Sequence, residues 1–333
     1  MSSPLVNPKE DLEPEEVRKE PKKDKKPDMG YLPVHFCTEG RLDAPEVLHF
    51  RNYKMDEALE LSRVRDDLFE EYLIRILNRM VWEEFDCGLL HKEELLEVIL
   101  NLHVNFWSKT LDGFRYFIDE DLPEDERNSR ENILEATINI SDIEVKNIPE
   151  KFAEPVRITT PEKTVYKFKL LRMQDRIAVK NKIDKEFASR EKRYEVVKLQ
   201  FIENPNLRAS DVKNPGMVEK MLEYNDLISE KDSKYFMYLE YAKLFSVEYA
   251  DGKGVTFDSL EDKISAAEDV DLTIWSDLKK GLKDIEFGVN RNVDFYSTEL
   301  NKKLNRRFRF RLMDFLPSLD MENNSGNALS FGV

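Results

Sequence analysis

The side chains best suited to metal binding lie in the first third of the sequence. His35, Cys37 and His49 are close together in the chain, and His91 follows Cys87 by four residues. Thiolates and imidazoles are common zinc ligands, and a structural zinc site usually takes four of them. No Cys-x-x-Cys or His-x-x-x-His pair accompanies these residues. We therefore expect hydrogen-bonded structural roles for both sets and no bound metal.

No catalytic signature is present in the sequence. It lacks the nucleophile elbow, the Gly-rich dinucleotide loop, the His-Glu-x-x-His helix and the kinase motifs. The acidic run at 119–132 lacks the spacing of a calcium loop, and Gly252-Lys253-Gly254 lacks that of a phosphate loop. The histidines form no triad with a serine or a cysteine. The sequence therefore indicates no enzyme, no cofactor and no catalytic residue.

Basic and aromatic residues alternate near the end of the chain, within 301–311. The basic residues are Lys302, Lys303, Arg306, Arg307, Arg309 and Arg311, and the aromatic residues are Phe308 and Phe310. Such a pattern is able to stack on and grip single-stranded nucleic acid. An edge strand with its charged side in water has the same pattern. Because the net charge is −15, we favour the edge strand, with an acidic protein partner as a third alternative.

Length and composition predict a helix-rich protein with a substantial core. The 333 residues are 41% hydrophobic and 36% charged, and only 11 are glycine. The two cysteines exclude a disulfide framework and are typical of a reducing compartment. No apolar run is long enough to span a membrane and no secretory signal is present, so we expect a cytoplasmic protein.

We expect the fold to begin within residues 31–53. Apolar residues alternate with polar ones on both sides of a Glu39-Gly40 turn, and alternation of this kind predicts a β-hairpin. The side chains of His35 and His49 then lie on the face opposite the apolar residues.

Helical periodicity follows the hairpin. Apolar residues recur at intervals of three and four over 64–81 and again over 95–107, with a glycine-containing link between them. Two helices of similar length with a short link predict an antiparallel helical hairpin. Alternation returns over 136–170, with a turn at 159–163, and predicts a small β insertion.

A long and highly charged helix is predicted over 174–202. Its apolar stripe is narrow, and basic residues such as Lys182, Lys185 and Arg193 cover its other faces. Such a helix either bridges two domains or offers a seam to a partner helix. We therefore assign partner binding to these three residues and to Arg307, Arg309 and Arg311 of the basic segment.

Capping and turn residues mark the remaining elements. Asn214 and Pro215 have the residue types of an N-cap and a first helical position, which predicts a helix start. The next helix, over 231–245, is apolar on almost all sides and is predicted to be the most buried helix of this half. The same signals predict a hairpin over 247–257, a helix capped by Asp258 with Glu261, a last helix capped by Asp271, and strands over 285–287, 293–296 and 308–312.

The predicted fold class is α+β and dominated by helices. It combines an N-terminal β-hairpin and helical hairpin, a small central β insertion, and a helical C-terminal half that ends in a β ribbon. The expected units are a disordered tail (1–28), a hairpin plus helical domain (29–135), a small β insertion (136–173), a helical domain with C-terminal strands (174–317) and a loose tail (318–333).

One long stretch of the sequence resembles a known family. It reads PVHFCTEGRLDAPEVLHFRNYKMDEALELS and continues through DDLFEEYLIRILNRMV and EFDCGLLHKEELLEVILNLHVNFW. This stretch resembles baseplate proteins of contractile-tailed bacteriophages, a family that includes hub components and hub-assembly proteins of T-even-type phages. The likeness is best over Leu32–Trp107, about a quarter of the chain.

The resemblance implies a late phage protein that builds, or helps to build, the hub or wedge of a tail baseplate. Its partners would then be other baseplate and tail proteins, met in the host cytoplasm during assembly and in the virion tail if the protein is retained. Two alternatives remain open: a transient hub-assembly chaperone that is absent from the mature virion, and a nucleic-acid-binding module that uses residues 302–311.

Overall fold

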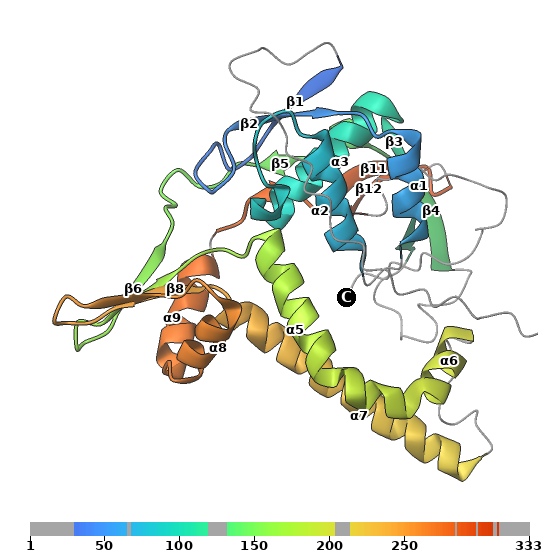
Figure 1. The fold of residues 1–333 in the computed structure, drawn as a ribbon. Helices are drawn as coiled ribbons and strands as arrows, with labels where there is room; N and C mark the ends of the chain where they lie inside the picture. The colour runs from blue at the N-terminus through green and yellow to red at the C-terminus, as the bar shows by residue number, and fades with distance from the viewer. Residues whose placement is uncertain are drawn as a thin grey trace, which may run out of the picture.

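The computed structural model describes residues 30–64, 68–118, 132–203, 214–283, 285–297, 299–308 and 312. Figure 1 shows a body of hairpins and helices, from which two long helices, α5 (Met173–Glu191) and α7 (Pro215–Tyr241), extend side by side as an arm. A small sheet with two short helices lies at the end of the arm nearer the body. The fold is mixed α+β, as the sequence predicts, and all strand pairs of the described residues are antiparallel.

The body contains elements from both ends of the chain. They are β1 (Tyr31–His35), β2 (Val47–Arg51), α1 (Met55–Arg63), α2 (Phe69–Met80), α3 (Lys92–Phe106), β3 (Thr110–Phe117), β4 (Ile133–Asn139), β5 (Val145–Lys146), β10 (Gly288–Val289), β11 (Asn292–Ser297) and β12 (Lys302–Arg307). The remaining elements are β6 (Val156–Thr159), β7 (Val165–Phe168), α5, α6 (Glu195–Glu203), α7, β8 (Leu244–Glu248), β9 (Gly254–Thr256), α8 (Leu260–Glu268) and α9 (Leu272–Lys283).

The predicted N-terminal hairpin is confirmed. β1 and β2 pair with Val34 opposite Leu48, and both side chains are buried. Glu39 and Gly40 have positive φ angles of 51° and 72°, which turn the chain between the strands. The alternation that predicts the hairpin therefore reflects one face packed on the core of the body.

The two predicted N-terminal helices are present as α2 and α3 and share one core. Their fully buried side chains are Leu73, Ile76, Leu77, Met80, Leu95, Ile99 and Leu102, each at most 2% exposed. The first helix begins at Phe69 rather than at Val64, and a further helix, α1, precedes it. Helical periodicity thus identified the residues that face the core. The predicted helix start was wrong because α1 and α2 are separate helices.

The C-terminal strands return to the N-terminal core. The ring of Phe308 lies 5.7 Å from that of Phe114, and the ring of Phe295 lies 5.0 Å from that of Tyr116. The hydroxyl of Tyr116 donates a hydrogen bond to Ser297 at 2.8 Å. Residues almost 200 positions apart therefore close one core.

The strands expected as one β insertion are shared among three sheets. β4 pairs with β3, β5 pairs with β10, and β6 and β7 form a four-stranded sheet in the order β6-β7-β8-β9. The predicted turn between the two strands of the insertion is confirmed as the β6–β7 hairpin. The partners β8 and β10 come from much later in the chain, so sequence alternation could indicate these strands but not what they pair with.

The arm differs from its sequence prediction in two places. The helix expected over 174–202 is interrupted by a 3-10 turn at Lys192–Tyr194, after which α6 bends away (Figure 1). The two helices expected after Asn214 are one helix, α7, and the segment from Leu244 to Glu248 is strand β8. Asn214 accepts the amide hydrogen of Gly216 at 3.1 Å, so the predicted helix start is confirmed.

The prediction that residues 231–245 form the most buried helix of this half is wrong. Phe236 is 65% exposed and Met237 is 38% exposed. The opposite side of the same helix, including Tyr238 and Leu239, is buried in a cluster with α5 and α8. A helix at the edge of an arm has neighbours on one side only, so a continuous apolar run leaves some of its members in solvent.

Smaller corrections concern caps and the last strands. Ser259 rather than Asp258 caps α8, because its hydroxyl accepts the amide hydrogen of Asp262 at 3.1 Å. The cap of α9 by Asp271 is confirmed through the amide of Thr273 at 2.8 Å. Strand β11 agrees with the prediction, whereas the strand expected over 285–287 is found at 288–289. Most of the strand expected over 308–312 lies outside the described residues, and β12 precedes it at Lys302–Arg307.

Candidate functional site

The first set of predicted metal ligands is separated by the hairpin. His49 lies beside Glu83, with its Nδ1 2.6 Å from a carboxylate oxygen, and His35 is exposed. Cys37 is buried, and its backbone amide donates to Glu97 at 3.0 Å. Cys37 and His49 thus each contact a carboxylate from another segment, and the three residues do not form one cluster.

The second set is also engaged in local structure. The backbone amide of Cys87 donates to Asn78 at 2.7 Å. His91 is the N-cap of α3, and its Nδ1 accepts the amide hydrogen of Glu93 at 3.2 Å. Burial, together with the nearby charge of Arg172, lowers the pKa of His91 to about 3, so the imidazole is neutral. Within the described residues no three His, Cys, Asp or Glu side chains are grouped to hold a metal ion.

Two buried carboxyl groups on α3 lie beneath the β1–β2 loop. Thr38 donates its hydroxyl hydrogen to Glu94 at 2.5 Å, and the amide of Cys37 donates to Glu97. Burial raises the pKa of both carboxyls, and that of Glu97 reaches about 7. One oxygen of Glu97 is buried without a hydrogen-bond partner. Burial therefore favours the protonated form of the Glu97 carboxyl.

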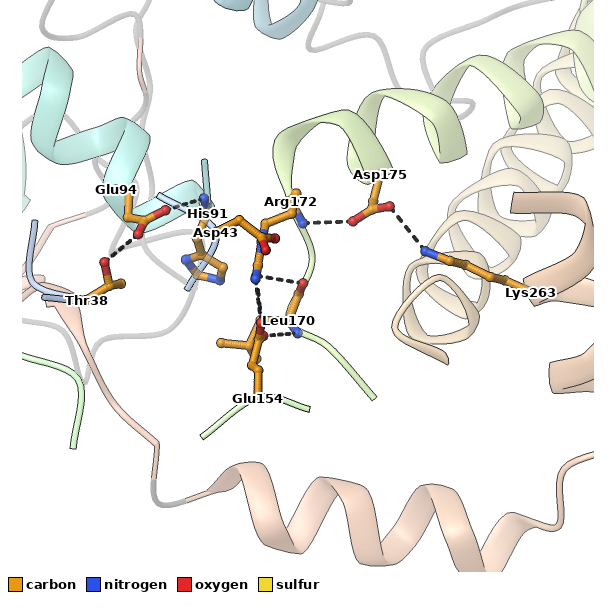
Figure 2. A network of polar contacts seen from close by, with 9 residues as sticks. All are labelled: Thr38, Asp43, His91, Glu94, Glu154, Leu170, Arg172, Asp175 and Lys263. Atoms are coloured by element: carbon orange, nitrogen blue, oxygen red, sulfur yellow. Dashed lines mark hydrogen bonds and ion pairs between the residues drawn. The ribbon is translucent and has the colours of Figure 1, made fainter. Parts of the chain in front are cut away.

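A polar network joins this region to the start of the arm (Figure 2). The guanidinium of Arg172 contacts Asp43 at 2.7 Å and Glu154 at 2.5 Å, and it donates to the carbonyl of Leu170 at 2.9 Å. The backbone amide of Arg172 donates to Asp175, whose carboxylate also lies 3.4 Å from the ammonium of Lys263. The guanidinium of Arg172 thus binds one carboxylate from the hairpin loop and one from the residues before β6, while its backbone amide binds the carboxylate of Asp175 on α5.

The first residues of α3 and of α5 lie next to each other in this network. His91 precedes α3 and Arg172 precedes α5, and the two residues form an antiparallel β-bridge. The amide of His91 donates to Glu94 at 2.7 Å, and that of Arg172 donates to Asp175 at 3.0 Å. Each carboxylate therefore caps an otherwise unpaired amide at a helix N-terminus. The arrangement fixes the direction in which α5 leaves the body.

The six basic residues assigned to partner binding do not form one surface. Lys182, Lys185 and Arg193 belong to the arm, where Lys182 is half-buried near Glu186 and the other two are exposed. Arg307 ends β12 in the body and is exposed. Arg309 and Arg311 lie outside the described residues. The first four are therefore divided between two separate parts of the molecule (Figure 1).

The arm presents exposed apolar side chains that the sequence prediction missed. On α7 these are Leu222, Phe236 and Met237, and on α6, which lies at the far end of the arm (Figure 1) and is counted as part of it, they are Val196 and Leu199. The available signal was the seven-residue spacing of Leu222, Ser229 and Phe236, which places them on one side of a helix. The Met–aromatic run hid this signal, because such a run is more often part of a core.

Comparison of the chain with known protein families, curated proteins and solved structures gives no match. Among the described helices, none has the length and apolar character that a membrane crossing requires. The candidate site is therefore defined by geometry alone. It consists of the arm, with its exposed apolar side chains, and of the buried polar network around Arg172 at the start of α5, which we call the joint at Arg172.

Proposed function

We propose that the protein is a structural or assembly component of a contractile phage tail baseplate and acts through protein–protein contacts. The observation that carries this proposal is the arm, whose helix α7 exposes Phe236 to 65% and Leu222 to 53%. Large apolar side chains cost free energy in water, so several of them on one projecting element indicate a surface that a partner covers.

The joint at Arg172 supports the same proposal. A surface that is already held in its binding direction loses less conformational entropy when a partner arrives. The arm meets this condition, because the start of α5 is tied to three other segments through Asp43, Glu154 and Lys263. Rigid placement of an adhesive surface is what an assembly protein requires, whereas a catalytic cleft is not needed.

The baseplate context comes from the resemblance of Leu32–Trp107 to hub and hub-assembly proteins. These residues form β1, β2 and α1–α3, which make up much of the body from which the arm extends (Figure 1). In this proposal the protein meets its partners in the host cytoplasm and either remains in the virion tail or leaves as a transient chaperone. Mass spectrometry of purified virions separates these two forms, since only the first leaves peptides of this chain in the particle.

The proposal is tested with an arm variant in infected cells. The double substitution Val196→Ser and Leu199→Ser changes exposed residues of α6 and should leave the free energy of unfolding within about 0.5 kcal/mol of the original value. The variant chain should nevertheless fail to co-purify with tail proteins and should fail to support tail assembly. The matched control is Val255→Ser, an exposed residue of β9 outside the arm. Normal tails from the double variant, and equally from Phe236→Glu, would overturn the proposal.

One observation favours the nucleic-acid alternative. Tyr296 on β11 is opposite Lys303 on β12, and both side chains are mostly exposed. An exposed ring next to lysines is the arrangement that stacks on a base. Asp294 lies 3.3 Å from the ammonium of Lys303 and neutralises part of this charge. Binding to single-stranded DNA at low salt that weakens steeply with added salt would support the alternative, and no binding at low salt would exclude it.

A further inference from the structure

We propose that the outer face of α7 docks a basic amphipathic helix of a partner protein. The outer face is the side of α7 turned away from α5, and its exposed residues are Glu219, Leu222, Asp226, Ser229, Asp232, Ser233, Phe236, Met237 and Glu240. This inference deepens the proposed function and rests on it, because it names the chemistry of the partner that the arm takes.

The shape of the outer face fits a helix. Leu222 and Phe236 lie on the same side, four helical turns and about 21 Å apart along the axis. Ser229 and Ser233 lie between them near the middle of the face, with Asp226 and Asp232 closer to the two anchors. Apolar anchors two heptads apart, with the small Ser229 at the heptad position between them, match the seam along which a second helix packs.

The charge of the outer face is uniformly negative. After Lys220, the only basic residues of α7 are Lys231 and Lys234. Lys231 contacts Asp184 at 2.8 Å and Glu191 at 2.5 Å, both on α5. Lys234 contacts Glu186 of α5 at 2.7 Å.

Lys231 and Lys234 thus form ion pairs on the side of α7 that faces α5. On the outer face Asp226 and Asp232 stand beside the apolar anchors, and neither forms an ion pair with a described residue. A partner therefore meets apolar side chains bordered by acidic ones.

Charge complementarity indicates which kind of partner binds the outer face. A second copy of this chain carries the same net charge of −15 and is repelled at long range, whereas a basic segment is attracted. Leu222 and Phe236 require an apolar stripe on that segment, and Asp226 with Asp232 requires lysine or arginine beside the stripe. A helix with leucine-like residues at heptad spacing and basic neighbours satisfies both requirements.

The test uses the full chain and a synthetic 21-residue helical peptide with leucine at heptad seam positions and lysine elsewhere. Fluorescence anisotropy should detect binding of this peptide, and a peptide with glutamate in place of lysine should not bind. Leu222→Ser with Phe236→Ser should weaken binding at least about tenfold, as expected when interface anchors are truncated. Asp226→Asn with Asp232→Asn should weaken it and reduce its salt dependence.

The matched control is Tyr296→Ser, which removes a similarly exposed ring from the body. It should leave peptide binding unchanged. Equal binding of the lysine peptide to the original chain and to the Leu222/Phe236 variant would overturn the inference, as would absence of binding. Sedimentation that shows a dimer lost in Phe236→Ser would also overturn it, in favour of a second copy as the occupant.

The two proposals fail separately. If the peptide does not bind but Phe236→Glu still prevents tail assembly, the partner chemistry is wrong and the assembly role stands. If the peptide binds through the outer face but the arm variants assemble normal tails, the docking site stands and the assembly role is wrong.

Discussion

The guanidinium of Arg172 lies 2.5 Å from the carboxylate of Glu154, and the two side chains are only 4% and 8% exposed. Arg172 immediately precedes α5, whereas Glu154 precedes the sheet at the base of the arm. The pair therefore ties the start of α5 to the segment that leads into this sheet, at a point where water is nearly excluded, and Asp43 of the β1–β2 loop contacts the same guanidinium. A buried ion pair adds little net stability compared with apolar packing, but loss of one partner leaves a charge without compensation.

Replacement of Arg172 by methionine should destabilise the protein by about 3–5 kcal/mol, since Glu154 would remain buried and unpaired. Urea unfolding measures the change. The control is Lys280→Met, which removes an exposed pair with Asp277 and should cost no more than about 1 kcal/mol. Equal effects of the two substitutions would contradict the view that the joint at Arg172 directs α5.

Stability should depend on the ionisation of Glu97. Because burial raises its pKa from 4.5 to about 7, the folded protein keeps a proton that the unfolded chain loses above pH 4.5. Unfolding therefore releases a proton in this window. The contribution of the protonated Glu97 carboxyl to the free energy of unfolding is fully present below pH 4.5. It is lost as the pH rises to about 7, which lowers the free energy of unfolding by at most about 3 kcal/mol.

The substitution Glu97→Gln removes that titration. The free energy of unfolding of the variant, measured between pH 5 and 8, should fall less steeply with pH than that of the original chain. Cys37, Glu94 and Glu93 act on the same carboxyl and remain in both proteins, so the difference between the two curves isolates Glu97. Parallel curves would show that the carboxyl is ionised throughout this range.

Gly288 should not tolerate alanine. Its φ is 89°, and a Cβ there would lie 2.5 Å from the Cβ of Glu93 on α3. Gly252 has a similar φ of 80° but open space around it, so Gly252→Ala carries only the backbone cost of about 1–2 kcal/mol. Gly288→Ala should cost about 1–3 kcal/mol more, because the clash is added. Thermal unfolding of both variants measures these two costs. Equal costs would contradict the close approach of β10 to α3.

The two sides of α7 should respond differently to truncation. Leu239 is 8% exposed and packs with α5, so Leu239→Ala should cost about 2–4 kcal/mol. Phe236→Ala should change stability by less than about 0.5 kcal/mol, although the residue removed is larger. Urea unfolding of both variants decides this. A large cost at Phe236 would mean that another part of the chain covers the outer face.

Both cysteines should resist alkylation in the folded protein. Burial, followed by the charge of Glu97, raises the pKa of Cys37, and Cys87 is fully buried. Iodoacetamide at pH 8 should therefore label neither residue until urea unfolds the chain, and peptide mapping reports each site separately. Rapid labelling of Cys37 in the folded state would indicate that the β1–β2 loop opens.

Local signals in the sequence predicted the elements that depend on neighbouring residues. The alternation around Glu39-Gly40 predicted the β1–β2 hairpin, and Asn214-Pro215 predicted the start of α7. Such signals succeed because strand alternation and helix capping are decided within a few residues. They were less accurate for the strand expected over 285–287, which is found as β10 at Gly288–Val289 and depends on pairing with β5 from a distant part of the chain.

Tertiary structure alone decided the candidate site. The sequence by itself determined an acidic, helix-rich α+β protein with one apolar side on the helices predicted over 64–81, 95–107 and 174–202. Three features could not be predicted from it: the position of Asp43 and Glu154 around Arg172, the pairing of β5 with β10, and the exposure of Phe236 to solvent. Each of these depends on which distant segment lies opposite, and a side chain's burial and charge environment are properties of that neighbour rather than of its own position in the chain.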